Sequence, residues 1–148
     1  MWAERLTKCM VLPLAFLSMS AAASSQPLSQ PLTEVLAQRS GLSPGEVVSL
    51  LASCDANPTS MKFCAWRDQL AAERTLQRLL DEKRTESPKC AAALEQKLTA
   101  WQKLRDKTCR ESAAREWGDG SMLSAAVAMC ETDRTKEMAR SLSANSCP

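Results

Sequence analysis

Apolar residues recur three and four positions apart over three long stretches of the chain, a period that places them on one face of a helix. The stretches cover about residues 60–84, 88–116 and 121–142. No stretch alternates apolar and polar residues as a half-buried strand does, so the pattern predicts three main helices. The residues expected to face inward are Met61, Ala65, Ala72, Leu76 and Leu79; Leu94, Leu98, Trp101, Arg105 and Thr108, with Leu104 beside them; and Leu123, Val127, Cys130, Arg134, Met138 and Leu142.

Two shorter helices are expected before the long ones. Ser43, with Glu46 three residues later, has the spacing of a capping box and predicts a helix that ends near Ser53. Residues 31–39 can form another short helix, which Gly41 would end.

The ends of the long helices are predicted from residues that cap or stop helices. Thr59 or Ser60 is expected to cap the first, and Ser87, followed by a proline, opens the second. Gly118 ends the second helix, and Ser121 is expected to cap the third. The fold class is therefore all-α: a small antiparallel bundle of three main helices plus one or two short N-terminal helices.

The first 23 residues have the three parts of a cleavable export signal. Arg5 and Lys8 form a positive start, residues 9–19 are apolar, and small residues offer a cleavage site between positions 20 and 25. The apolar part is shorter than the roughly 20 residues that span a bilayer. We expect a signal peptide over residues 1–23, a flexible lead-in over 24–31 and one helical domain over 32–148, periplasmic or secreted and without a membrane span.

The cysteines predict disulfides. Cys9 lies in the signal, and six others follow, an even number that in an exported chain indicates three bridges. If the last two helices are antiparallel about a turn at Gly118–Gly120, residues equally far from that turn lie level with each other. No two cysteines have the C-x-x-C spacing of a thioredoxin-like site or a zinc ribbon. The predicted bridges are Cys109–Cys130, Cys90–Cys147 and Cys54–Cys64.

Charge and composition exclude several classes of function. The chain carries 19 basic and 17 acidic residues, a net charge of +2, and removal of residues 1–23 leaves +1. This balance provides neither a basic arm for nucleic acid nor an acidic tail. The chain has no histidine, which excludes Ser-His-Asp and Cys-His catalysis and the commonest zinc ligand. We therefore predict a protein that is not an enzyme and holds no cofactor or metal.

Charged residues also stand where apolar ones are expected. Arg105 and Arg134 lie on otherwise apolar stripes, with Asp106 beside the first, and a buried charge is costly unless it is paired. The two arginines either project at a ligand or form a polar network that joins two helices, and we favour the network. Carboxylates of the first long helix alternate with basic residues, which indicates a solvated face with i,i+4 ion pairs. These carboxylates are Asp68, Glu73, Asp81 and Glu82.

One tryptophan marks a candidate contact surface. Trp117 stands beside Gly118 and Asp119, where no helix face is expected to shield it. An exposed tryptophan next to a rigid turn is typical of a binding hot spot. The alternative, which we favour, is a cap that folds back on the hairpin end. Trp117, Gly118 and Asp119 are the candidate contact with a protein partner, and the loop between Cys54 and Cys64 is the second choice.

The sequence resembles the LprI-like lysozyme-inhibitor family over about residues 54–142. The run from Trp101 to Cys109 resembles the family's W-x-x-x-R-D-x-x-C core, and the glycine-serine pair before Cys130 resembles its turn into the last helix. The arginine after the last family cysteine stands about one helical turn earlier here. The residues that carry the resemblance are Trp101, Arg105, Asp106, Gly120, Ser121 and Arg134.

The chain also departs from the family pattern. Members often have D-x-x-L-N-x-x-Y on the first long helix, where this chain has Glu73, Leu76, Gln77 and Leu80. Cys90 and Cys147 are an added pair.

The resemblance implies an exported helical protein that inhibits lysozyme. We expect the protein to bind lysozyme or another peptidoglycan-cleaving enzyme and to block its cleft sterically. The alternative is a structural or immunity-type interaction protein of the cell envelope with no activity on lysozyme. A good inhibitor of a cationic lysozyme is expected to be acidic, and the net charge of this chain gives no such help.

Overall fold

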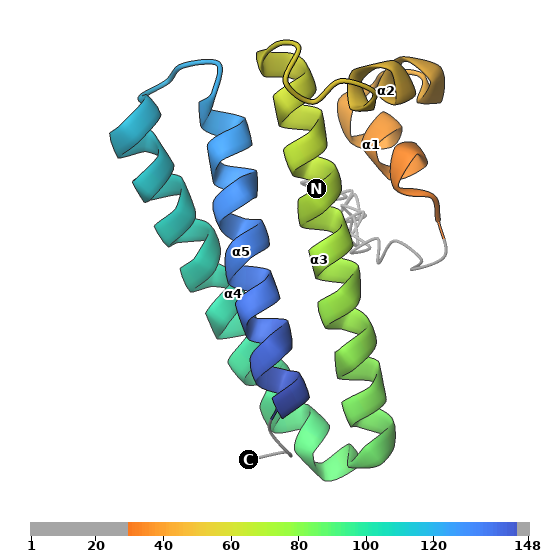
Figure 1. Cartoon of the computed structure of the whole chain (residues 1–148). Coiled ribbons are helices and arrows are strands. Elements are labelled where there is room, and N and C mark those ends of the chain that lie inside the picture. Colours follow the sequence, from red (N-terminus) through yellow and green to blue (C-terminus); the bar gives the residue numbers. More distant parts are fainter. Residues whose placement is uncertain (1–29, 145–148) are drawn as a thin grey trace, which may run out of the picture.

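The computed structural model describes residues 30–144, which form five helices and contain no strand. Three long helices make a bundle, and two short helices lie against the side of the first long one (Figure 1). The all-α prediction is confirmed. The helices are α1 (Leu32–Ser40), α2 (Pro44–Leu51), α3 (Pro58–Glu86), α4 (Pro88–Trp117) and α5 (Leu123–Ala144).

The two short helices begin and end where the capping residues predict. Gly41 follows α1 with a φ of 75°, a left-handed conformation that glycine adopts without steric cost. At α2 the Ser43 side chain accepts from the backbone N–H of Glu46, and the Glu46 carboxylate accepts from the backbone N–H of Ser43. This reciprocal pair is the predicted capping box, although α2 ends two residues before Ser53.

The caps of the long helices differ from the prediction. Asn57, not Thr59 or Ser60, caps α3: its side-chain oxygen accepts from the backbone N–H of Ser60. The reason is Pro58, whose fixed φ suits the first helical position and places the preceding residue in the extended conformation of a cap. The predicted cap at Ser121 is also wrong, because α5 begins at Leu123 and the Ser121 hydroxyl bonds to none of the described residues.

The bundle is closed along α3 and α5 by small side chains. Ala65 of α3 packs with Ala125 and Ala128 of α5, and the last two are 0% and 2% exposed. The inward stripe predicted for α5 is confirmed only in part: Met138 and Leu142 pack half-buried against the core, whereas Arg134 is exposed. Because α5 lies between α3 and α4 (Figure 1), the small residues occupy the close contact and the larger apolar ones flank it. The buried residues of α5 are Ala125, Ala128, Glu131, Thr132, Thr135 and Ala139.

The stripes predicted for α3 and α4 are confirmed in their central parts. Leu76 of α3 and Leu94 and Leu98 of α4 share one buried cluster, against which Trp101 and Leu79 pack half-buried. The prediction fails at Thr108 and Leu104 of α4, which are exposed. Cys109 takes the inward position instead of Thr108 and is fully buried. A second cluster joins the short helices to the start of α3, and its members are Val35, Leu36, Ala37, Val47, Phe63 and Leu70.

Two of the predicted disulfides are present, Cys54–Cys64 and Cys109–Cys130. The Cys109–Cys130 bridge confirms the antiparallel register of α4 and α5. Cys147 lies outside the described residues, so its pairing with Cys90 stays a prediction. The expected signal over residues 1–23 also lies outside them. Within residues 30–144, no helix is both long and apolar enough to cross a membrane.

Candidate functional site

A buried arginine joins the three long helices. The Arg105 side chain is 6% exposed, and its guanidinium donates to the Thr135 hydroxyl of α5 at 2.7 Å. The same group forms ion pairs with Asp106 at 2.8 Å and with Glu73 of α3 at 3.3 Å. It also lies 5.2 Å from the centre of the Trp101 ring. Arg105 therefore forms the interhelical network that the sequence predicts. It contacts Trp101 and Asp106, which belong to the same family motif, and the Glu73 carboxylate of α3.

Arg134, the other predicted stripe arginine, lies outside this network. Its side chain is 57% exposed and pairs with Glu137 on the same helix at 3.2 Å. A shift of one residue along a helix turns a side chain by about 100°. Thr135 thus takes the inward position on α5, and Arg134 points to solvent.

Next to Arg105 lies a buried carboxyl that the sequence analysis did not identify. Glu131 of α5 is 7% exposed, and its side chain accepts a hydrogen bond from the Gln69 amide of α3. Burial raises the pKa of Glu131, because desolvation disfavours the charged form, and the positive charge of Arg105 opposes the rise in part. The sequence carries only a weak signal that Glu131 is buried. Glu131 stands four residues before the inward-facing Thr135, on the same side of α5, and the Thr135 hydroxyl donates to the Glu131 backbone carbonyl.

A groove of about 570 Å³ leads from this carboxyl to the surface between α3 and α5. Its volume falls within the roughly 300–1,000 Å³ of typical ligand pockets. The groove brings Gly120 and Ser121 of the turn next to Lys62, Trp66 and Gln69 of α3. Its lining includes Lys62, Trp66, Gln69, Arg110, Ser121 and Glu131. These side chains supply a carboxyl, two cations, an aromatic ring and a hydroxyl. Such groups can contact a ligand through ion pairs, hydrogen bonds and stacking.

Two cations lie near the ring of Trp66, which lines this groove. The Lys62 ammonium lies 5.1 Å and the Arg39 guanidinium 5.8 Å from the ring centre, both within the range of cation–π attraction. Phe63 packs against the same ring at 5.4 Å. These contacts fix Trp66 to the end of the bundle where the Cys54–Cys64 disulfide lies.

The candidate contact turn lies at the same end of the bundle, beside the start of α3 (Figure 1). Trp117 is 44% exposed, and Gly118, with a φ of 55°, ends α4. A Cβ on Gly120 would come within 3.0 Å of the Trp117 carbonyl oxygen, so the turn favours glycine there. Gly118, Asp119, Gly120 and Ser121 are all exposed. The structure thus places the predicted contact residues on an accessible, sharply bent turn.

The carboxylates expected on a solvated face behave in two ways. Asp68, Asp81 and Glu82 form ion pairs with Arg67, Arg84 and Arg78 along α3. Only the pair of Arg78 with Glu82 has the predicted i,i+4 spacing. Glu73 instead faces Arg105. Within the described part of the chain, no three metal-ligating side chains lie close enough together to hold an ion.

Comparison with known proteins identifies the family. No curated protein and no solved structure matches the chain significantly. The family model described as lysozyme inhibitor LprI matches residues 53–142, from just before the first disulfide to the last turns of α5. This match covers the Arg105 network, both observed disulfides and the contact turn. Since it also covers more than half of the sequence, the chain belongs to the LprI lysozyme inhibitor family.

Proposed function

We propose that the protein is an exported lysozyme inhibitor that blocks the enzyme's cleft sterically, without a covalent step. Membership of the LprI family is the observation that carries this proposal. The two disulfides support export, because such bridges persist in oxidising compartments such as the periplasm. The proposed partner is lysozyme or another enzyme that cleaves peptidoglycan.

The contact surface we propose is the turn from Trp117 to Ser121. Trp117 offers a large, partly exposed ring, and the Cys109–Cys130 disulfide ties together the two helices that carry the turn. A surface that is held in shape before binding loses less conformational entropy when the partner docks. The loop between Cys54 and Cys64 lies at the same end and is the second candidate.

Basic side chains near the turn suit an acidic cleft. Lysozymes use a pair of carboxylates in catalysis, so a cation carried into the cleft meets opposite charge. Arg115 lies in the last turn of α4, is exposed and forms no ion pair with any described residue. We propose Arg115 as the cation that accompanies Trp117 into the cleft.

The test is a turbidity assay of lysozyme activity at physiological salt. Oxidised protein is titrated against c-type and g-type enzymes, with reduced and alkylated protein as the control. Saturable inhibition by the oxidised form alone supports a folded inhibitor. No inhibition at tens of micromolar would contradict the proposal and favour an envelope or immunity-type partner, a reading that the near-neutral net charge of +2 supports.

Replacing Trp117 with alanine tests the contact surface. We expect inhibition to weaken at least tenfold, because a hot-spot residue contributes about 2 kcal/mol or more to binding. The melting temperature should stay within about 2 °C, since the side chain is not in the core. Leu104→Ala is the matched control, an exposed apolar residue on the same helix but away from the turn. A large fall in melting temperature for Trp117→Ala would instead indicate that Trp117 stabilises the fold, which would contradict its role as a contact residue.

A further inference from the structure

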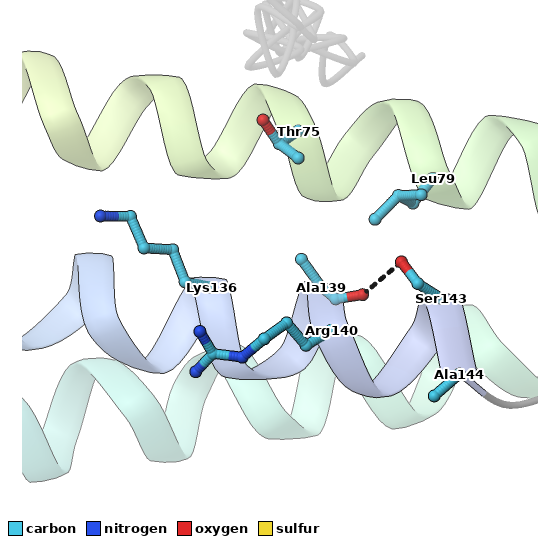
Figure 2. Close-up of a pocket in the computed structure, with 7 residues that line it drawn as sticks. All are labelled: Thr75, Leu79, Lys136, Ala139, Arg140, Ser143 and Ala144. Atoms are coloured by element: carbon cyan, nitrogen blue, oxygen red, sulfur yellow. Dashed lines mark hydrogen bonds between the residues drawn. The ribbon is translucent and has the colours of Figure 1, made fainter.

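A second groove lies between α3 and the C-terminal half of α5, away from the contact turn (Figure 2). Its volume is about 520 Å³, and its lining from Lys136 to Ala144 extends about 12 Å along α5. The floor is apolar, formed by Leu79 of α3 and Ala139 of α5. The hydroxyls of Thr75 and Ser143 bond to the carbonyls of their own helices.

The groove has two chemically different ends. Figure 2 shows the charged groups of Lys136 and Arg140 toward one end, and Leu79 with Ala144 toward the other. This polarity follows from helix geometry, because side chains lean toward the N-terminus of their helix and carry both charges away from the last turn.

The two cations at this groove have no partner in the described protein. Neither Lys136 nor Arg140 forms an ion pair or hydrogen bond with any residue that the structure describes. Arg134, on the same helix, pairs with Glu137 instead. Two unpaired positive charges beside an apolar floor are complementary to a ligand that carries a negative head on an apolar chain.

We infer that this groove binds a single-chain amphiphile with an anionic head, such as a fatty-acid carboxylate or an alkyl phosphate. The head lies at the Lys136 ammonium, which Figure 2 shows reaching toward α3, and Arg140 adds a second positive charge from over α5. The chain lies over Leu79 and Ala139 toward the end of α5. This site is separate from the proposed lysozyme contact, which lies at the opposite end of the bundle.

An acidic peptide fits the groove less well. It would satisfy the two cations but would leave the apolar end covered by polar backbone, whose hydrogen bonds to water would be lost. A neutral apolar chain would cover the floor but leave the cations unused. The combination of the two features therefore selects an amphiphile.

The experiment is isothermal titration calorimetry of the oxidised protein, with each ligand below its micelle-forming concentration. We expect decanoate and decyl phosphate to bind, and decanol to bind at least fivefold more weakly. Acetate, decyltrimethylammonium and a tetraglutamate peptide should show no measurable binding. Binding of decyltrimethylammonium as tight as that of decanoate would overturn the inference, and so would equal binding of the peptide or no binding of either anion. Comparing decanoate with decyl phosphate separates a carboxylate preference from a phosphate preference.

Variants locate the site. The double substitution Lys136→Gln and Arg140→Gln should weaken decanoate binding at least fivefold and decanol binding less than twofold. Arg134→Gln is the matched control and should change decanoate binding less than twofold. Ser143 is exposed, so Ser143→Phe should be tolerated by the fold and should place a ring over the apolar end of the groove. We expect it to weaken the binding of both decanoate and decanol. Unchanged decanoate affinity in the double variant would place the ligand elsewhere and overturn the inference.

Discussion

At the scale of single residues, the two arginines that the sequence places on apolar stripes have opposite environments. Arg105 is buried and bonds to side chains on α3 and α5 as well as to its neighbour Asp106. Arg134 is exposed and pairs only along its own helix. The difference depends on which face of α5 turns toward the bundle. The residues around Arg134 do not indicate that Thr135, rather than Arg134, lies on that face.

Replacing Arg105 with methionine tests its role in the fold. We expect the free energy of unfolding to fall by about 2–3 kcal/mol, because the hydrogen bonds of a charged group to both other helices are lost. The loss stays below that of a fully buried pair, since Glu73 and Asp106 can still reach water. Urea denaturation of oxidised protein measures it. Arg134→Met is the matched control and should stay within about 0.5 kcal/mol.

Glu131 makes stability depend on pH. Its pKa in the folded protein is raised from the ordinary 4.5 because burial disfavours the charged carboxylate, a cost that Arg105 and Arg110 reduce and that Asp106 and Glu73 increase. The folded state therefore binds its proton more tightly than the unfolded state. Stability is highest when both states are protonated and falls as pH rises through 4.5 toward the raised folded pKa.

The variant Glu131→Gln should remove this part of the pH dependence. The glutamine keeps the shape and the acceptor oxygen that the Gln69 amide contacts, but it has no charge to desolvate. We expect the variant to gain stability relative to the wild type as pH rises above 4.5. Urea midpoints measured from pH 4 to 8 check it. Glu46, whose pKa is lowered by its bonds to Ser43, is present in both proteins, so its opposite contribution cancels in the difference.

At the scale of the helices, local signals and tertiary contacts contribute differently. The starts of α2 and α4 and the end of α1 follow from Ser43, Pro88 and Gly41, because caps and breakers act within a few residues. The buried face of α5 did not follow from its larger apolar residues. It is set by how closely α3 approaches, and this approach requires small side chains such as Ala125 and Ala128 at the contact.

The start of α3 offers a direct test of a local signal. Asn57→Ala should lower the free energy of unfolding by about 1 kcal/mol, because the backbone N–H of Ser60 loses its acceptor. Thr59→Ala, at the exposed one of the two positions that the sequence predicted as a cap, should change it by less than about 0.5 kcal/mol. Thermal and urea unfolding of both variants give the comparison. Equal losses would mean that Thr59 shares the capping role.

Only part of the candidate site could be predicted from the sequence alone. The turn at Trp117 and the interhelical role of Arg105 were accessible, since an exposed aromatic residue and a charge on an apolar stripe are visible as single positions. The groove beside Ser121 was not, because Lys62, Gln69 and Glu131 come together only through the parallel alignment of α3 and α5. A groove of this kind depends on distances between helices, which periodicity does not specify.

At the scale of the whole molecule, the described disulfides support one end of the bundle. Cys54–Cys64 lies at the start of α3, and Cys109–Cys130 lies near the α4–α5 turn. At the opposite end, α5 finishes beside the start of α4 (Figure 1). Leu94 and Leu98 of α4 share their buried cluster with Ala139, against which Leu142 packs.

This register predicts the third bridge. Moving one turn back along α4 from Leu94 reaches Cys90, and moving on from Leu142 leads toward Cys147. A non-reducing peptide map should therefore recover these two cysteines in one linked peptide. Reduction should release the two halves. Recovery of Cys147 as an alkylated free thiol, or linked to any other cysteine, would contradict the register at this end.

A confirmed bridge should stabilise the fold by about 2–4 kcal/mol, because it restricts the unfolded chain over a long loop. Cys147→Ser should then lower the midpoint of urea unfolding while leaving lysozyme inhibition in place, since the proposed contact turn lies at the other end of the bundle.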